Sequence, residues 1–179
     1  MDARQKVLDL LRQRALIRGR FKLASGEVSD HYFDCKRVTL DPDGAFYIAE
    51  VILDLLQAER IAAGAIGGPT IGADPIATAV AMRSRERGHP LPAFLVRGRT
   101  KDHGTGQRLE NAPPPGTAVV MVEDVVTTGG STLRAIQACE GAGLRVAAVV
   151  CVVDREQGGA AALSGYRFLP LFRRSEVLA

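Results

Sequence analysis

Apolar residues follow two different spacings along the chain, and these spacings alternate. A helical spacing predicts helices in residues 3–17, in the stretch after Asp41, in "ADPIATAVAMRSRERG" and in "GGSTLRAIQACEGAG". Short apolar runs between them are typical of buried strands, as in "RIAAGAIGG", "LPAFLVRG", "TAVVMVED" and "LRVAAVVCVVD". "YRFLPLF" is expected at the edge of the sheet, because Pro170 has no N–H to donate. Strands that alternate with helices predict an α/β fold with a doubly wound, mainly parallel sheet and helices on both faces.

One stretch interrupts this alternation. Residues 98–116, "GRTKDHGTGQRLENAPPPG", show no hydrophobic period. A connection of that length without structure of its own is usually a functional lid or a linker, so we expect a mobile loop here. The 179 residues contain no repeat and suit one hydrophobic core, which predicts a single domain over residues 1–179.

The composition excludes several classes of protein. Hydrophobic residues make up 46% and charged residues 24%, and a net charge of +3 is too small to indicate nucleic-acid binding. The three cysteines form no CxxC pair, which argues against a disulfide framework or a zinc site. No apolar run reaches the roughly 18 residues of a membrane helix, and the N-terminus mixes charged with apolar residues. We therefore expect a cytoplasmic protein without nucleic-acid or membrane partners.

The stretch "MVEDVVTTGGSTLRAI" combines two chemistries. Backbone N–H groups of "TTGGS" and of the following helix N-terminus form a cradle for an anion such as a terminal monophosphate. Glu123 and Asp124 would repel phosphate, but carboxylates accept hydrogen bonds from ribose hydroxyls and can influence a bound magnesium ion. A sugar phosphate satisfies both requirements. The alternative is a strand end with two solvated acids beside a capped helix.

The predicted mobile loop is strongly basic. Residues 97–108 hold four Lys or Arg residues against Asp102, a local charge of +3 that equals the charge of the whole chain. His103 adds a donor that can be protonated near neutral pH. Cations on a closing loop stabilise a leaving polyanion such as pyrophosphate and exclude water. The alternatives are an exposed basic loop without a role, or a nucleic-acid contact, for which the neighbouring aromatic residues are missing.

"VVMVEDVVTTGGST" resembles the signature of the type I phosphoribosyltransferases, which bind phosphoribosyl pyrophosphate (PRPP). The resemblance implies that the two acids hold the ribose hydroxyls and that the following loop holds the 5-phosphate. With the basic loop included, the implied PRPP-binding residues are Arg97, Lys101, His103, Glu123, Asp124, Val125, Val126, Thr127, Thr128, Gly129, Gly130 and Ser131.

"FLVRGRTKDHGTG" is similar to the mobile loop of one subfamily, the orotate phosphoribosyltransferases, whose usual form is R-K-E-x-K-x-H-G. Gly98 and Arg99 depart from that form, because lysine and glutamate are usual there. In the subfamily this loop reaches into the neighbouring subunit's site, which implies a homodimer with the basic loop shared across the interface. The matching positions are Arg97, Lys101, His103 and Gly104.

Two further stretches concern the base that would accept the phosphoribosyl group. Arg155 in "VVDREQGG" and Thr127 match the subfamily's orotate contacts, and a guanidinium can bind a carboxylate through two hydrogen bonds. A local salt bridge between Arg155 and Asp154 is the alternative. "FKLASGEVSDHYFDCKR" is similar to the N-terminal substrate segment of a small hood over residues 1–40. Some relatives have a base-contacting lysine where this chain has alanine, which leaves Lys22 or Lys36 as candidates.

The resemblance implies transfer of phosphoribosyl from PRPP to orotate, giving orotidine 5′-phosphate and pyrophosphate in pyrimidine (UMP) biosynthesis. The implied catalytic residues are Lys101, His103 and Asp124. Mg²⁺ would be bound through the pyrophosphate of PRPP, with no direct protein ligand. The alternatives are a phosphoribosyltransferase for another base, and a PRPP-sensing regulator without catalysis.

Overall fold

A computed structural model describes residues 2–22, 28–98 and 108–179. Its centre is a six-stranded sheet in the order β5-β4-β3-β6-β7-β8, and all neighbouring strands are parallel except the short β5. This arrangement confirms the predicted α/β fold with a mainly parallel sheet. The strands are β3 (Ala65–Pro69), β4 (Ala93–Val96), β5 (Leu109–Glu110), β6 (Ala118–Val126), β7 (Arg145–Asp154) and β8 (Phe168–Arg173).

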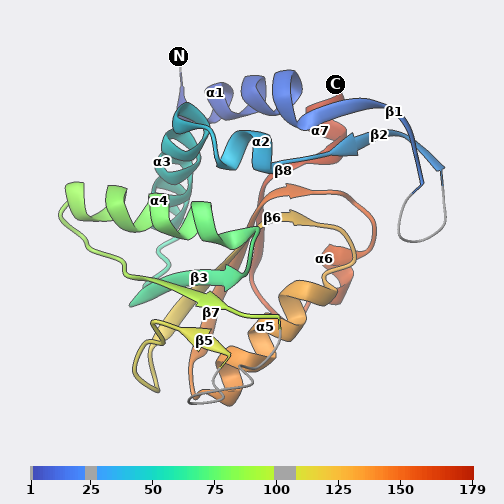
Figure 1. The fold of residues 1–179 in the computed structure, drawn as a ribbon. Helices are drawn as coiled ribbons and strands as arrows, with labels where there is room; N and C mark the ends of the chain where they lie inside the picture. The colour runs from blue at the N-terminus through green and yellow to red at the C-terminus, as the bar shows by residue number, and fades with distance from the viewer. Residues whose placement is uncertain (1, 23–27, 99–107) are drawn as a thin grey trace.

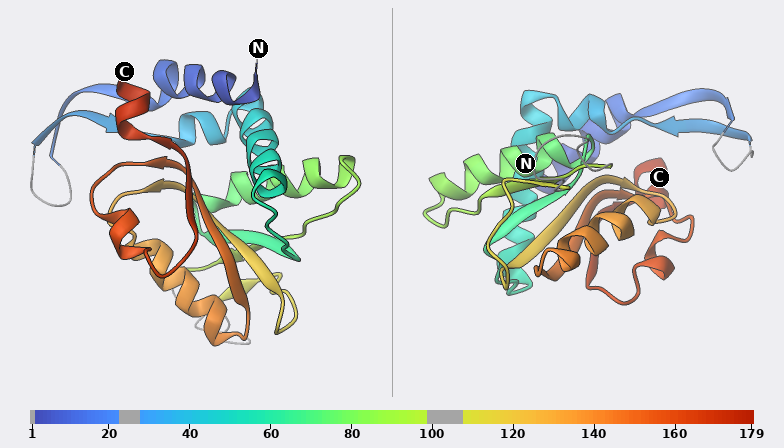
Figure 2. Two further views of the ribbon diagram at one scale, coloured as in Figure 1. Left: turned by 180° about the vertical axis from the view of Figure 1, so that it is seen from behind. Right: turned by 60° about the horizontal axis from the view of Figure 1, so that its bottom comes forward.

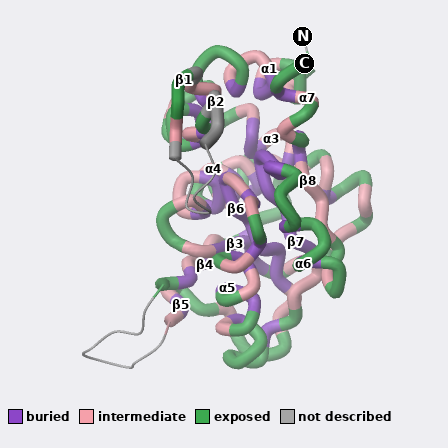
Figure 3. The backbone as a smooth tube through the Cα atoms, turned by 90° about the vertical axis from the view of Figure 1, so that its right-hand side faces the viewer, coloured by how far each residue is buried: buried purple, intermediate pink, exposed green. Residues whose placement is uncertain are grey.

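Helices cover both faces of the sheet (Figure 1, Figure 2). Alternate residues of β6 point to opposite faces, because successive side chains of a strand do so. Val120 and Val122 pack with α3 and α4, whereas Val119 and Met121 pack with α5 and with Leu163, which follows α6. The buried residues gather in the central strands (Figure 3). The helices are α3 (Pro42–Ala58), α4 (Ala73–Glu86), α5 (Gly130–Gly141) and α6 (Gly159–Ala162).

The N-terminal segment lies over the carboxyl-end side of the sheet, and its two strands extend outward as an antiparallel pair (Figure 1). The C-terminal helix α7 (Arg174–Leu178) packs beside it. The segment consists of α1 (Ala3–Leu10), the π-helical turn η1 (Leu11–Ala15), β1 (Leu16–Lys22), β2 (Val28–Phe33) and α2 (Lys36–Thr39).

Two details differ from the sequence prediction. The helix predicted over residues 3–17 ends earlier, because Leu16 is extended and pairs with Phe33 of β2. Part of the loop predicted over residues 98–116 is a strand, because Leu109 is buried against the core and β5 pairs with β4. β8 lies at the sheet edge, which agrees with the position predicted from Pro170.

In the described part of the chain, no helix has the length and apolar character needed to cross a membrane. All three cysteines are buried free thiols.

Candidate active site

Three loops meet at the carboxyl edge of the sheet. β6 and β7 are parallel neighbours whose last residues, Val126 and Asp154, are paired in register. Directly beyond them, the N–H of Arg155 donates to the carbonyl of Val126 over 2.9 Å. The loop after β3 reaches the same edge, where ligands of such sheets usually bind. Residues far apart in sequence therefore form one candidate site.

The acid pair is buried at this edge. Glu123 is 5% exposed and Asp124 is 7% exposed. Both carboxylates face Gly72, in the loop between β3 and α4: a Cβ at position 72 would lie 2.4 Å from Asp124 Oδ1 and 2.5 Å from Glu123 Oε1. Only glycine fits so close an approach. Sequence reasoning missed this role, because no local pattern records a contact between the loop after β3 and the acids of β6.

Burial determines the charge of the acid pair. It raises the pKa of Glu123 to about 8, and the neighbouring charge of Asp124 contributes to that rise. Ser131 Oγ donates to Glu123 Oε2 over 3.4 Å, and the N–H of Val125 donates to Asp124 Oδ1 over 2.9 Å. Burial and mutual repulsion therefore favour a proton on the pair near neutral pH, so the pair can both donate hydrogen bonds to hydroxyl groups and accept them.

Lys36 supplies a positive charge to the pair. Its Nζ lies 3.4 Å from Asp124 Oδ2, and the charge of Asp124 raises the pKa of Lys36. The structure thus brings one of the two candidate lysines to the site, from α2 in the N-terminal segment. The side chain of the other candidate, Lys22, lies outside the described residues.

The start of α5 is a free anion cradle. Gly129 has a φ of +80°, a conformation that favours glycine, and among the described residues no side chain caps the helix. Thr127 is half-buried and Thr128 exposed in the turn before it, whereas Val125 and Val126 complete β6. The N–H groups of Gly130 and Ser131 stand in the first turn of α5. This geometry suits a phosphate.

Arg155 is the buried cation of the site. It is 8% exposed, and within the described residues its Nε has no hydrogen-bond partner. The described residues also contain no ion pair between Arg155 and Asp154, whose Oδ1 instead accepts from the N–H of Glu156 over 2.9 Å. Burial lowers the pKa of Arg155, with Tyr32 as a close polar neighbour. A buried guanidinium with an unused donor is ready for an anionic ligand.

The basic loop is described only at its base. The N–H of Arg97 donates to the carbonyl of Arg108 over 2.8 Å, and Arg97 Nη1 lies 3.1 Å from Glu110 Oε1. Lys101 and His103, the predicted loop residues, lie outside the described part of the chain.

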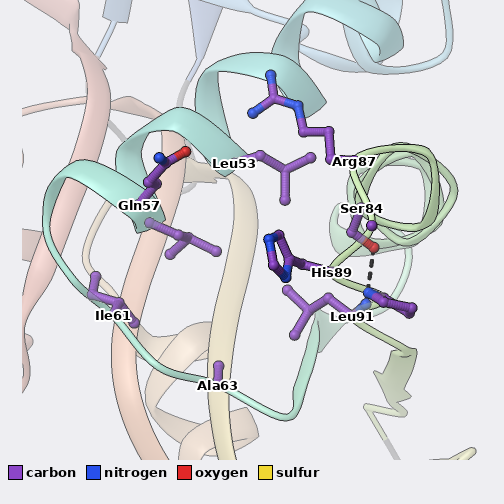
Figure 4. A pocket seen from close by; sticks show the side chains of 11 residues that line it. Leu53, Gln57, Ile61, Ala63, Ser84, Arg87, His89 and Leu91 are labelled. Atoms are coloured by element: carbon purple, nitrogen blue, oxygen red, sulfur yellow. Dashed lines mark hydrogen bonds between the residues drawn. The ribbon is translucent and has the colours of Figure 1, made fainter.

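A large cavity lies at the other end of the strands, near the start of β3. It measures about 710 Å³ and is lined by the C-terminal ends of α3 and α4 and by Ala63, which precedes β3. His89 points into it, and Ser84 Oγ accepts from the N–H of Leu91 at its wall (Figure 4). None of the predicted site residues lines it.

Comparison with known proteins gives a consistent result, although no protein-family model matches the chain. A protein of Thermococcus gammatolerans named orotate phosphoribosyltransferase is 42% identical over 99% of this chain and 93% of its own length. Orotate phosphoribosyltransferase of Mycobacterium tuberculosis H37Rv, solved with Fe(III) dicitrate, has a TM-score of 0.86 at 34% identity and covers 98% of both chains. The same enzyme solved with PRPP has a TM-score of 0.82 at 31% identity over 99% of both chains. With such identity along nearly its whole length, the chain belongs to the orotate phosphoribosyltransferase family.

Proposed function

We propose that the protein transfers the phosphoribosyl group of PRPP to N1 of orotate, giving orotidine 5′-phosphate and pyrophosphate in pyrimidine biosynthesis. The observation that carries this proposal is the meeting of three features at one sheet edge. These are the buried acid pair, the uncapped start of α5 and the buried guanidinium of Arg155 with its unpartnered Nε among the described residues. Each feature suits a different part of the two substrates.

PRPP would lie along β6 and α5. The 5-phosphate would accept hydrogen bonds from the backbone of residues 127–131, and the ribose hydroxyls would bond to Glu123 and Asp124. A proton on the acid pair is useful here, because two fully charged neighbouring carboxylates would repel each other. Asp124 would remain the principal acceptor of the pair.

Orotate would lie against the end of β7. Its carboxylate would pair with the guanidinium of Arg155, which is desolvated and lacks a partner at Nε within the described residues. Thr127 would contact the base from the other loop. Lys36 would supply the cation that the lysine of some relatives provides, because its ammonium already reaches the acid pair from α2.

Catalysis would rest on positioning and charge. The bond between C1′ of the ribose and the pyrophosphate oxygen breaks, its electron pair leaves with pyrophosphate, and N1 of orotate bonds to C1′. The oxocarbenium-like ribosyl group would be stabilised near the acid pair, and Lys101 and His103 would assist the leaving pyrophosphate. Arg97, held at the base of the loop by Arg108 and Glu110, would place these residues.

Mg²⁺ is the proposed cofactor. It would be bound through the pyrophosphate oxygens of PRPP, with no direct protein ligand, because Mg²⁺ usually keeps substrate phosphates among its ligands. When bound with PRPP it would neutralise charge on the pyrophosphate. Loss of transfer on chelation with EDTA, and its return with added Mg²⁺, would test this.

A homodimer is proposed because large apolar side chains are exposed on α3, on α4 and in the loop before α4. Ile71 is 66% exposed next to Gly72, and Met82 on α4 is 65% exposed. Phe46 on α3 is also exposed, and the guanidinium of Arg83 stacks over its ring. Large exposed apolar side chains of this kind favour protein contacts. Sedimentation velocity would test the dimer.

The cytoplasm is the proposed location. The three buried cysteines are free thiols, which suit a reducing compartment. Fractionation of cells that express the tagged protein would test this, and recovery outside the cytoplasmic fraction would contradict it.

The decisive experiment is an assay with orotate, PRPP and Mg²⁺ that follows the loss of orotate absorbance and the release of pyrophosphate. Omission of PRPP is the control. Adenine, hypoxanthine and uracil in place of orotate would expose a different acceptor. Transfer to one of these bases but not to orotate would contradict the proposed acceptor, and PRPP binding without transfer to any base would contradict catalysis.

A further inference from the structure

The residue after Arg155 is attached to the C-terminal helix. Glu156 Oε2 accepts a hydrogen bond from the N–H of Ser175 over 2.8 Å, and Glu156 Oε1 accepts one from Ser175 Oγ over 3.1 Å. Ser175 stands in the first turn of α7, so the carboxylate takes both donors that this residue offers. The loop after β7 is thereby joined to the end of the chain, 19 residues away.

The backbone around Arg155 is held on both sides. The N–H of Arg155 bonds to the carbonyl of Val126, and the N–H of Glu156 bonds to Asp154 Oδ1, each over 2.9 Å. Glu156 has a φ of +57°, a left-handed conformation that L residues other than glycine rarely adopt. A strained conformation persists only where surrounding contacts hold it. The bonds between the Glu156 carboxylate and Ser175 are contacts that can do so.

The helix at the other end of this link is itself fixed. Arg12 donates from Nε to the carbonyl of Val177 over 3.2 Å and from Nη2 to the carbonyl of Glu176 over 2.9 Å. Arg4 Nη2 donates to the carbonyl of Leu171, near the end of β8, over 3.0 Å. Val177 is buried in the core. The N-terminal segment, α7 and the loop of Arg155 therefore form one connected unit.

The ionisation of Glu156 favours its hydrogen bonds to Ser175. The hydrogen bond from the backbone of Ser175 lowers the pKa of Glu156, and the positive charges of Arg173 and Arg174 lower it further. The carboxylate is therefore ionised near neutral pH, when it accepts both bonds.

We propose that Glu156 is a positioning residue, which acts through Ser175 to hold the loop backbone that directs Arg155 toward the carboxylate of orotate. The inference rests on the proposed function, because it assumes that Arg155 binds orotate. It gives the C-terminal helix a part in the recognition of one substrate only. PRPP would contact β6 and α5, which the bonds between Glu156 and Ser175 do not touch.

Two variants test the link. Glu156→Gly removes the carboxylate while leaving a residue that adopts a positive φ without strain, so a defect cannot be ascribed to a strained φ at this position. Ser175→Ala removes the hydroxyl donor and keeps the N–H. We expect Glu156→Gly to raise the KM for orotate about three- to tenfold, as the loss of ordinary hydrogen bonds would, and Ser175→Ala to raise it less. The KM for PRPP should stay within about twofold of wild type, because the change is confined to Arg155.

The controls separate positioning from stability and from the proposed function. Glu176→Gln alters α7 and its bond to Arg4 without touching Glu156, and should leave the KM for orotate unchanged. Arg155→Ala is measured in parallel. Normal orotate KM in both Glu156→Gly and Ser175→Ala, beside a large defect in Arg155→Ala, overturns the link alone. Equal rises in the KM for orotate and for PRPP also overturn it, since they indicate general loosening. If Arg155→Ala has a normal KM for orotate, the proposed contact between Arg155 and orotate is itself refuted.

Discussion

Replacing Gly72 with alanine would place a methyl group against two buried carboxylates. The new Cβ would lie 2.4 Å from Asp124 Oδ1 and 2.5 Å from Glu123 Oε1. Favourable contact between such atoms begins at about 3.5 Å, so both carboxylates, or the backbone of residue 72, must move by about 1 Å. The backbone of Gly72, with φ −60° and ψ −40°, suits any residue. The substitution therefore tests the contact with the acid pair and leaves the backbone unstrained.

The two possible effects on stability have opposite signs. Alanine in a compatible backbone usually stabilises a protein by about 0.4–1 kcal/mol, because the unfolded chain loses conformational freedom. Overpacking a filled site costs about 1–3 kcal/mol. Since the neighbours are two buried acids, we expect Gly72→Ala to lower the free energy of unfolding by about 1–2 kcal/mol. Displaced carboxylates should also bind ribose less well, with kcat/KM for PRPP reduced about tenfold for each 1.4 kcal/mol lost.

Urea denaturation measures the first quantity, and initial rates at varied PRPP measure the second. Gly141→Ala is the matched control, because a Cβ at position 141 would meet open space and its φ is not positive. That variant should be as active as wild type and about 0.4–1 kcal/mol more stable. If Gly72→Ala gains stability and binds PRPP normally, the close approach of Gly72 to the acid pair is refuted.

Three further predictions concern the charged groups. Glu123 has a pKa raised from 4.5 to about 8, so it stabilises the fold most below pH 4.5 and loses that contribution as the pH rises toward 8. The urea midpoint of wild type should therefore fall between pH 5 and 8, and Glu123→Gln should reduce this fall. An equal fall in the variant would contradict a buried, protonated acid. Arg155→Lys keeps the charge but not the planar fork, and should raise the KM for orotate about tenfold while the KM for PRPP stays normal; equal effects on both substrates would argue against a carboxylate contact. Lys101→Ala should lower kcat far more than it weakens PRPP binding measured by calorimetry, and near-normal turnover would contradict its role in pyrophosphate departure.

The sequence predicts the sheet well because its strands are apolar and separated by amphipathic helices. β6 and β7 follow from runs of valine, and the start of α5 follows from its glycines. The short β5 was not predicted, because two residues are too few to show the alternation of apolar and polar positions that is typical of a strand. The early end of the first helix was also not predicted, since η1 has the same helical spacing as α1.

The site was predictable where neighbours in sequence carry the chemistry. Glu123 and Asp124 precede the phosphate cradle directly, and Arg155 follows a strand end. Contacts between distant segments were not predictable, because no local pattern records them. Lys36 meets Asp124 across 88 residues, and Gly72 meets the same acid from another strand's loop. Such pairs are set by tertiary packing alone.

The register of β6 with β7 divides the reaction between two strands. β6 and β7 end side by side, at Val126 and Asp154. The proposed PRPP-binding residues therefore begin at the end of β6, and the proposed orotate-binding residue Arg155 follows the end of β7. Each half of the site has its own loop, and a backbone hydrogen bond from Arg155 to Val126 joins the two. The side chain of Arg155 can therefore be varied with little disturbance to the phosphoribosyl half, because that bond uses only backbone atoms. This makes the loop after β7 the natural target for redesigning the protein toward other acceptor bases.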